Sequence, residues 1–368
     1  MSSHLTILGS SLTALAVARD AHALGLNPMI MDTARGIACH TRRARQLLLS
    51  PQLSPRELTQ RLIEATPQRD YLIASSDQWV KYVVAERSAL EQAYRVILHP
   101  ANSALEICLD KAKFAAWCAA NEIAAPRAWL AGVEPRPAQL NPPFLIRPAS
   151  TLHSSGAVKL PKATEARSES ELEAWLQTFA EQQCPAIVSE SLLHQPLTQF
   201  SVPFARSRGG LQIFVARKLR PAAQHCAVGS YVELEPQPEV EQLVRRAVEA
   251  LDYFGIGEAE VLRSESTGRL YLIEINARPW LQYALAPASG HDFLGTLVGM
   301  PRSMRPMKVG RRWINLGSDL YVAFSSSIGS VRRGELGLGS YLLSLLRANV
   351  YARFDMLDPA PAFRRIDR

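Results

Sequence analysis

The sequence is poor in features that would place the protein outside the cell or within a membrane. Its 368 residues include only five cysteines, scattered without Cys-x-x-Cys spacing, and this pattern predicts reduced thiols in a cytoplasmic protein. Apolar runs stay shorter than about 18 residues, which argues against a transmembrane helix. The opening residues, MSSHLTILGSS, lack a basic segment followed by a long apolar one, so we expect no secretory signal. Internal repeats and low-complexity segments are also absent from the sequence.

Composition and charge narrow the class of protein further. Hydrophobic residues make up 47% of the chain and charged residues 20%, as in ordinary soluble proteins, and the length predicts two or three domains. The net charge of +7 is spread over many arginines, several of them in the C-terminal tail. An anionic small substrate or a membrane surface explains this charge as well as a nucleic acid does, and the chain lacks a nucleic-acid recognition motif. We therefore expect no nucleic-acid partner.

The N-terminal part has the pattern of a βαβ unit that continues into a parallel sheet. Alternating strand and helix patterns cover the segments 4–9, 11–24, 27–32, 55–65 and 70–74. The outline also fits a dinucleotide-binding fold, but Gly9 does not belong to a Gly-x-Gly-x-x-Gly motif. The third strand ends at Ser75, Ser76 and Asp77. These side chains either contact a ligand at the carboxyl end of the strand or cap the helix that follows.

A second pattern lies near the middle of the C-terminal half. Two apolar, alternating segments joined by a polar turn predict a β-hairpin within residues 255–279. Glu260 interrupts the first strand, and Glu274 and Asn276 interrupt the second. Because Glu274 and Asn276 are two residues apart, we expect them on one face of the sheet, with Arg278 further along the same face. Carboxylate and amide oxygens are ligands that Mg²⁺ accepts, and a guanidinium suits a phosphate.

This hairpin resembles the metal-binding hairpin of the ATP-grasp ligases, whose second strand carries a Glu-x-Asn-x-Arg run. Here the run is Glu274-Ile275-Asn276-Ala277-Arg278. The resemblance implies an α/β and α+β protein, with an N-terminal Rossmann-like (pre-ATP-grasp) parallel-sheet domain followed by a two-lobed ATP-grasp fold. The implied segments are an N-terminal domain, a small lid subdomain, a catalytic lobe that binds the metal, and a C-terminal extension packed on the ligase core: 1–108, 109–190, 191–300 and 301–368.

The same resemblance implies a binding site for ATP. Lys111, at the start of a helix, would contact phosphate, and Arg147 would do so where the family usually has a lysine. Only Gly156 represents the glycine-rich flap of many relatives, so Ser154 and Ser155 are weak candidates for phosphate contacts. Three residues at the hinge between the lobes would surround adenine: Glu190, Ser191 and Leu193.

The family resemblance further implies roles for the hairpin residues. Glu260, Glu274 and Asn276 would hold two Mg²⁺ ions, with Mn²⁺ as an alternative, and Arg278 would be catalytic. Arg217 is a second catalytic candidate, although a basic run after a strand is also typical of a solvated surface.

The function implied is that of a ligase of the carboxylate–amine (or carboxylate–thiol) branch. It would activate a carboxylate as an acyl phosphate and join it to an amine, releasing ADP and phosphate. The alternatives are a non-catalytic ATP-binding relative, and carboxyl phosphate chemistry like that of carbamoyl-phosphate synthetases or biotin carboxylases. The expected partners are small molecules, with an amino acid or a surface-polymer precursor among the options. The sequence leaves the oligomeric state open, and a homodimer is one option.

Overall fold

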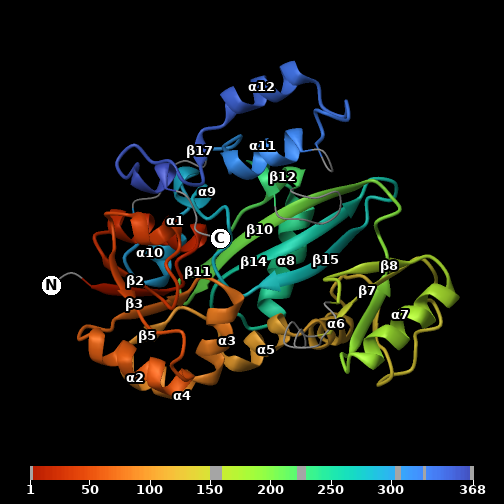
Figure 1. Ribbon diagram of the computed structural model, residues 1–368, viewed down its shortest axis with the longest axis horizontal. Coiled ribbons are helices and arrows are strands. Elements are labelled where there is room, and N and C mark those ends of the chain that lie inside the picture. The colour runs from red at the N-terminus through yellow and green to blue at the C-terminus, as the bar shows by residue number, and fades with distance from the viewer. Residues whose placement is uncertain (1–2, 150–159, 222–228, 303–307, 326–328, 365–368) are drawn as a thin grey trace.

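The computed structural model describes residues 3–149, 160–221, 229–302, 308–325 and 329–364 (Figure 1). Three β-sheets organise this part of the chain: a parallel sheet near the N-terminus, a small antiparallel sheet, and a large sheet that is antiparallel except at one edge. The predicted fold class is therefore confirmed.

The N-terminal sheet has the strand order β3-β2-β1-β4-β5, and all its strand pairs are parallel. The strands are β1 (His4–Leu8), β2 (Asn27–Asp32), β3 (Arg45–Leu48), β4 (Tyr71–Ala74) and β5 (Val96–Ile97). The helices are α1 (Leu12–Ala23), η1 (Ile37–His40), α2 (Pro55–Ala65), α3 (Asp77–Ala85), α4 (Arg87–Ala93) and α5 (Asn102–Leu109). Ser11 caps α1, and Ser54 and Glu57 form a reciprocal capping box at the start of α2.

The strand order reverses at β1, with β2 on one side and β4 on the other, and this is the point where open α/β sheets bind ligands. Gly9 ends β1 with a φ of +102°, and a Cβ there would lie 2.5 Å from Oγ of Ser75. Only glycine fits this close approach. Ser76 caps α3 by accepting a hydrogen bond from the Trp79 N–H, so the capping alternative is the correct one for Ser76.

The small sheet lies within the segment 109–190 that the sequence predicts as a lid, a name kept for it below, and has the order β6-β9-β7-β8. Its strands are β6 (Ala128–Leu130), β7 (Phe144–Pro148), β8 (Thr164–Ala166) and β9 (Ala186–Glu190), accompanied by the helices α6 (Lys111–Ala120) and α7 (Glu169–Glu181). Ser168 caps α7 by accepting from the Glu171 N–H at 3.2 Å. The lid has a hydrophobic cluster of its own, which includes Phe144, Leu172 and Phe179. Figure 1 shows β7, β8 and α7 projecting to one side of the molecule.

The large sheet has the order β15-β14-β10-β12-β13-β16-β17, and β11 also pairs with β10. Its strands are β10 (Leu197–Ser207), β11 (Gly210–Ile213), β12 (Ala216–Pro221), β13 (Gly229–Leu234), β14 (Gly255–Ser264), β15 (Leu270–Asn276), β16 (Arg312–Ile314) and β17 (Val350–Tyr351). The helices of this part are α8 (Pro238–Ala250), α9 (Leu285–Ala288), α10 (Phe293–Leu297), α11 (Leu316–Phe324), α12 (Leu338–Arg347) and η2 (Ala360–Phe363). The C-terminal segment thus adds two strands to the large sheet.

The main hydrophobic core joins the N-terminal sheet to the large sheet. One cluster of buried side chains contains Leu8 and Leu72 from the first sheet together with Phe200 and Val261 from the second. Helix α8 contributes its apolar face to the same cluster, through Val240, Leu243, Val244, Ala247 and Val248. The N-terminal and large sheets therefore share one core, and α6 joins it through Phe114 and Cys118, whereas the small sheet and α7 pack around a cluster of their own.

Two further expectations concern thiols and membrane spans. Cys39, Cys108, Cys118 and Cys184 are free thiols, and Cys226 lies outside the described residues. A search of the described residues found no helix with the length and apolar character needed to cross a membrane.

Candidate active site

The β14–β15 hairpin places four polar side chains on one face of the large sheet. Its register pairs Glu260 with Glu274 and Glu258 with Asn276. The intervening residues Ala259, Val261, Leu272 and Ile275 point to the other face and are buried in the main core. Since this apolar face is fixed against α8, the polar set must face away from it, toward the rest of the candidate site.

Glu258 belongs to this cluster and was not among the residues chosen from the sequence. It is buried, accepts a hydrogen bond from the Ser201 hydroxyl on β10, and accepts another from Nδ2 of Asn276 at 3.3 Å. Nδ2 of Asn276 also lies 3.3 Å from Oε1 of Glu274. The available signal was the two-residue spacing between Glu258 and Glu260, the same spacing that had identified Glu274 and Asn276.

Lys218 supplies a cation from the neighbouring β12. Its Nζ lies 3.0 Å from Oε2 of Glu260, and its side chain is only 2% exposed. The register between β10 and β12 pairs Ser201 with Ala216 and Phe200 with Arg217, so Lys218 shares the face of Ser201. Lys218 is therefore the member of the basic run that reaches the acid cluster.

Arg217, the residue predicted from that basic run, lies on the opposite face of β12. Its side chain is 43% exposed, and its Nη1 lies 3.8 Å from Oε2 of Glu235. The structure thus does not bring Arg217 together with Glu260 and Glu274. The sequence places two cations side by side, and strand alternation decides which one enters the site.

Arg278 connects the hairpin to the N-terminal sheet. Its Nε donates to Oδ1 of Asp77 at 2.6 Å, and its Nη2 donates to Oδ1 of Asn276 at 3.2 Å. Asp77 is the first residue of α3, directly after the carboxyl end of β4. The Arg278–Asp77 ion pair therefore forms one boundary of the site. This boundary lies beside β1 and β4, where the strand order reverses and where Gly9 and Ser75 follow the two strands.

Lys111 and Arg147 approach the cluster from the lid. Lys111 is the first residue of α6, and its backbone N–H donates to the Ala149 carbonyl just after β7, the strand that carries Arg147. Burial lowers the pKa of Lys111, the Arg147 guanidinium lowers it further, and the Glu274 carboxylate acts in the opposite direction. The lid thus brings two cations close enough to Glu274 for their charges to act on one another.

The three residues predicted at the hinge lie at the junction of the lid and the large sheet. The Arg127 N–H donates to Glu190 at 2.9 Å, and the Arg127 guanidinium lies 3.3 Å from the same carboxylate. The Ser191 hydroxyl donates to Glu165 at 2.5 Å and accepts from the Leu193 N–H at 3.3 Å. The side chains of Glu190 and Ser191 therefore bind lid residues in this structure. The candidate flap residues Ser154, Ser155 and Gly156 lie outside the described residues.

Burial is the dominant influence on the charges of the cluster. It raises the pKa of Glu258, Glu260 and Glu274 above the ordinary range, while Lys218 acts in the opposite direction on all three. For Lys218 itself, burial alone would lower the pKa, but the Glu260 and Glu258 carboxylates outweigh it and the net shift is upward. One buried and two half-buried carboxylates share one buried ammonium, so the site still favours an added cation.

The donor set fits Mg²⁺ better than it fits a transition metal. Within the described residues, no group of three His, Cys, Asp or Glu side chains converges as a metal site complete in itself. Mg²⁺ needs only one or two protein carboxylates, because phosphate and water complete its coordination. Glu260 and Glu274 would provide these, and Asn276 would add its oxygen if its amide turned, since Nδ2 now faces the carboxylates and Oδ1 faces Arg278.

A separate cavity of about 2080 Å³ lies between α1, the turn of the β10–β11 hairpin and residues 349–357. In the described part of the chain it is lined by residues other than the candidates above. We place the candidate active site at the acid cluster, because charge and hydrogen bonding converge there.

Comparison with known proteins identifies the fold. No protein-family model matches the chain, and no curated protein matches it by sequence. Among solved structures, N5-carboxyaminoimidazole synthetase from Staphylococcus aureus complexed with ADP is similar, with a TM-score of 0.65, 12% identity, and 84% of this chain and 80% of that chain covered. The L-amino acid ligase from Bacillus licheniformis has a TM-score of 0.57 and 15% identity, with 75% and 67% covered. Pyruvate carboxylase from Rhizobium etli has a TM-score of 0.62 and 16% identity over 84% of this chain, but only 32% of that chain. The chain has the fold of the ATP-grasp enzymes.

Proposed function

We propose that the protein is an ATP-dependent ligase that joins a substrate carboxylate to an amine. The observation that carries the proposal is the acid cluster of the buried Glu258 with the half-buried Glu260 and Glu274, with cations on two sides. Lys111 and Arg147 face Glu274 from the lid, and Lys218 contacts Glu260 from the large sheet. Such an arrangement suits the positioning and charge neutralisation that phosphoryl transfer requires.

The reaction would proceed in two steps. An oxygen of the substrate carboxylate attacks the γ-phosphorus of ATP, and ADP leaves with the electrons of the broken bond. The amine nitrogen then attacks the acyl carbon, phosphate leaves, and the nitrogen loses a proton. Mg²⁺ held by Glu260, Glu274 and Asn276 would neutralise charge on the phosphates.

The chain's own residues would divide the remaining work. Lys111 and Arg147 would bind the phosphates from the lid side. The hinge at Glu190, Ser191 and Leu193 would hold adenine, which is supported by its place between the lid and the large sheet. Arg278 would bind the acyl phosphate and the intermediate, since Asp77 and Asn276 fix its guanidinium at the mouth of the N-terminal sheet. We assign the second cationic role to Lys218, because Arg217 faces the other side of the sheet.

Carboxyl phosphate chemistry, in which bicarbonate replaces the organic acid, is the second candidate. A specific observation favours it, since pyruvate carboxylase is among the similar structures. The match covers only 32% of that protein, however, against 67% of the L-amino acid ligase. We therefore place the ligase first.

The test is ADP release in the presence of Mg²⁺ and ATP. The panel comprises amino acids, hydroxy acids and amines in pairs, with bicarbonate as a separate arm. We expect release that requires both a carboxylate and an amine and is abolished by Glu274→Gln. Glu249→Gln, the same change on an exposed residue of α8, is the matched control and should retain full activity. Release that depends on bicarbonate would favour the second candidate, and a failure to bind ATP would refute both.

A further inference from the structure

The C-terminal part of the chain exposes an unusual amount of apolar surface. Fourteen of the nineteen large hydrophobic residues that are exposed among the described residues lie beyond residue 308. Scattered exposed apolar side chains are normal, but monomeric proteins rarely gather many of them in one region. The feature therefore needs an explanation.

Most of these residues belong to two neighbouring helices with the same pattern. Both α11 and α12 expose apolar residues at positions i, i+4, i+5 and i+8, with exposures between 41% and 83%. We call this set the α11–α12 face: Leu316, Leu320, Tyr321, Phe324, Leu338, Leu342, Leu343 and Leu346. An ordinary surface helix turns such a stripe toward the core. Here the stripe turns outward, and Figure 1 shows both helices at the outer edge of the molecule.

Polar contacts on their inner sides hold the two helices in this orientation. Arg220 on β12 makes a bidentate pair with Asp319 of α11, with both Nε–Oδ1 and Nη2–Oδ2 at 2.8 Å. Its Nη1 also donates to the Ser344 hydroxyl of α12 at 2.9 Å. Asp319 is fully buried. The apolar stripes face outward because the polar side of each helix is anchored inward.

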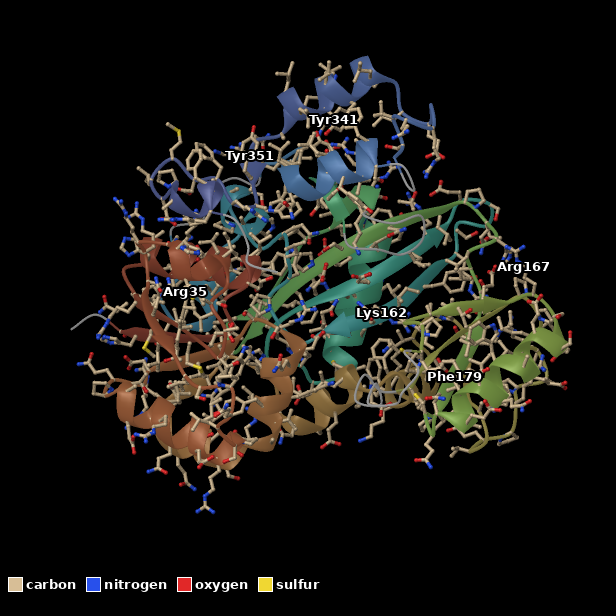
Figure 2. All side chains as sticks on the ribbon, viewed as in Figure 1. Arg35, Lys162, Arg167, Phe179, Tyr341 and Tyr351 are labelled. Atoms are coloured by element: carbon tan, nitrogen blue, oxygen red, sulfur yellow. The ribbon has the colours of Figure 1, made fainter. Side chains whose placement is uncertain are left out.

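Further contacts join the two helices. The Tyr231 hydroxyl donates to the Ser344 carbonyl at 2.8 Å, and the ring of Tyr341 packs edge-on against Phe324 with centroids 5.2 Å apart. Tyr341, which Figure 2 labels at this end of the molecule, is buried. The two helices thus form one fixed surface.

The segment that carries this face is basic in sum. Residues 301–368 contain twelve Lys and Arg against five Asp and Glu, a net +7, which equals the net charge of the whole chain. The first 300 residues are therefore neutral in sum. Arg332, Arg347 and Lys308 are exposed, and Arg347 directly follows Leu346 at the end of α12. An apolar face flanked by basic residues matches an interface with anionic headgroups outside and acyl chains beneath.

We propose that the α11–α12 face docks the protein onto the surface of an anionic lipid bilayer. The leucines enter the boundary between headgroups and acyl chains, and the arginines contact the headgroups. A second copy of the chain is a poorer occupant, because it would bring a region of the same net charge against this one. This inference uses none of the residues of the proposed active site, so each can fail without the other.

The experiment is vesicle flotation with the full chain. With vesicles containing about 30% phosphatidylglycerol in phosphatidylcholine, we expect binding about tenfold tighter than with pure phosphatidylcholine, and weaker binding as salt rises. Leu342→Glu combined with Leu346→Glu should weaken binding by at least about tenfold, because the charges oppose burial in the interface. Arg332→Glu with Arg347→Glu should remove the preference for anionic vesicles. Val133→Glu, an exposed apolar residue of the lid, is the matched control and should bind like the wild type.

A second measurement does not depend on loss of binding. Tryptophan in place of Leu346 (Leu346→Trp) should shift its emission to shorter wavelength with anionic vesicles and be quenched by brominated lipid. Equal binding to neutral and anionic vesicles, or unchanged binding by the double leucine variant, would overturn the proposal. A third outcome would also overturn it: the wild type fails to bind vesicles and sediments as a dimer, and the double leucine variant sediments as a monomer. The α11–α12 face would then join two copies of the chain.

Discussion

At the scale of single residues, Lys218 and Arg217 show that the direction of a side chain determines its contribution to the free energy of unfolding. Lys218 is buried against Glu260, so Lys218→Met would leave that half-buried carboxylate without its cation, at a cost of at most about 3–5 kcal/mol in the free energy of unfolding. Arg217→Met removes an ion pair to Glu235 that is largely exposed, and should cost less than about 0.5 kcal/mol. Urea denaturation of the two variants measures the difference, and equal losses would contradict the placement of Lys218.

His99 should make the stability depend on pH. It is buried beyond β5, where its Nε2 accepts from the Ala74 N–H at 2.7 Å and its Nδ1 lies 3.0 Å from the Ala277 carbonyl. Burial lowers its pKa from 6.5 to about 4. Because the unfolded chain binds the proton first, the neutral ring contributes stability that is complete above pH 6.5 and is lost as pH falls toward 4.

The size of this effect follows from the pKa shift. A difference of about 2.5 pKa units corresponds to about 3 kcal/mol in the free energy of unfolding. Urea midpoints measured from pH 7.5 to 4.5 for the wild type and His99→Gln should diverge, with the variant less stable at pH 7.5 and the gap narrowing toward pH 4.5. Parallel curves would show that His99 titrates normally.

The sequence identified the types of residue in the site better than their partners. The Glu-x-Asn-x-Arg run predicted three residues that the structure places along one face or beside it. Glu258 carried a local signal in its two-residue spacing from Glu260, but the role of Lys218 depends on register between strands that are distant in the chain, Ser201 against Glu260 and Ala216 against Ser201. Register is fixed by packing against α8, which a pattern within one strand does not contain.

At the scale of elements, the pair between Asp77 and Arg278 joins α3 to the end of the hairpin. Asp77 is about half exposed, so Asp77→Asn should change the free energy of unfolding by at most about 1 kcal/mol. Its effect on catalysis should be larger, because Arg278 would lose the group that orients it. We expect the rate of ADP release to fall by about tenfold or more with little change in the KM for ATP.

A matched control exists for this variant. Asp252→Asn removes a comparable exposed ion pair, to Arg206 at 3.4 Å, away from the acid cluster. It should leave ADP release unchanged. If both variants lowered the rate equally, or if Asp77→Asn raised only the KM for ATP, the orienting role of Asp77 would be wrong.

The boundaries of helices and strands also have two kinds of cause, contacts within a few residues and contacts between distant segments. The caps at Ser168 and Ser76 were predictable because a side chain and a backbone N–H three residues away define them. By contrast, the run 211–217 divides into β11 and β12 around Phe214 and Val215, which are buried in the core. Strand β5 is only Val96–Ile97, because β4 pairs with it at two positions.

At the scale of the whole molecule, two parts have independent cores. The lid is stabilised by its own cluster around Phe144 and Phe179, whereas the N-terminal and large sheets share one. The sequence predicted separate segments at 1–108 and 191–300, and the core they share gathers side chains more than a hundred residues apart, such as Leu8 and Phe200. Local patterns do not carry such contacts, so the chain's division into two packed bodies was not predictable.

This division predicts how the molecule opens. The small sheet and α7 pack around a separate cluster and can move or unfold locally without exposing the main core. Amides of β9 should therefore exchange hydrogen faster than those of β10 and β14. A non-hydrolysable ATP analogue with Mg²⁺, at about 100 times its Kd, stabilises the closed form by about 2.7 kcal/mol. Exchange through lid opening should then slow by about 100-fold. Amides of α4, remote from the lid (Figure 1), serve as the control and should not change. If β9 and β10 exchanged alike without nucleotide, or if the analogue left β9 unaffected, the lid would not be an independent unit that closes on ATP.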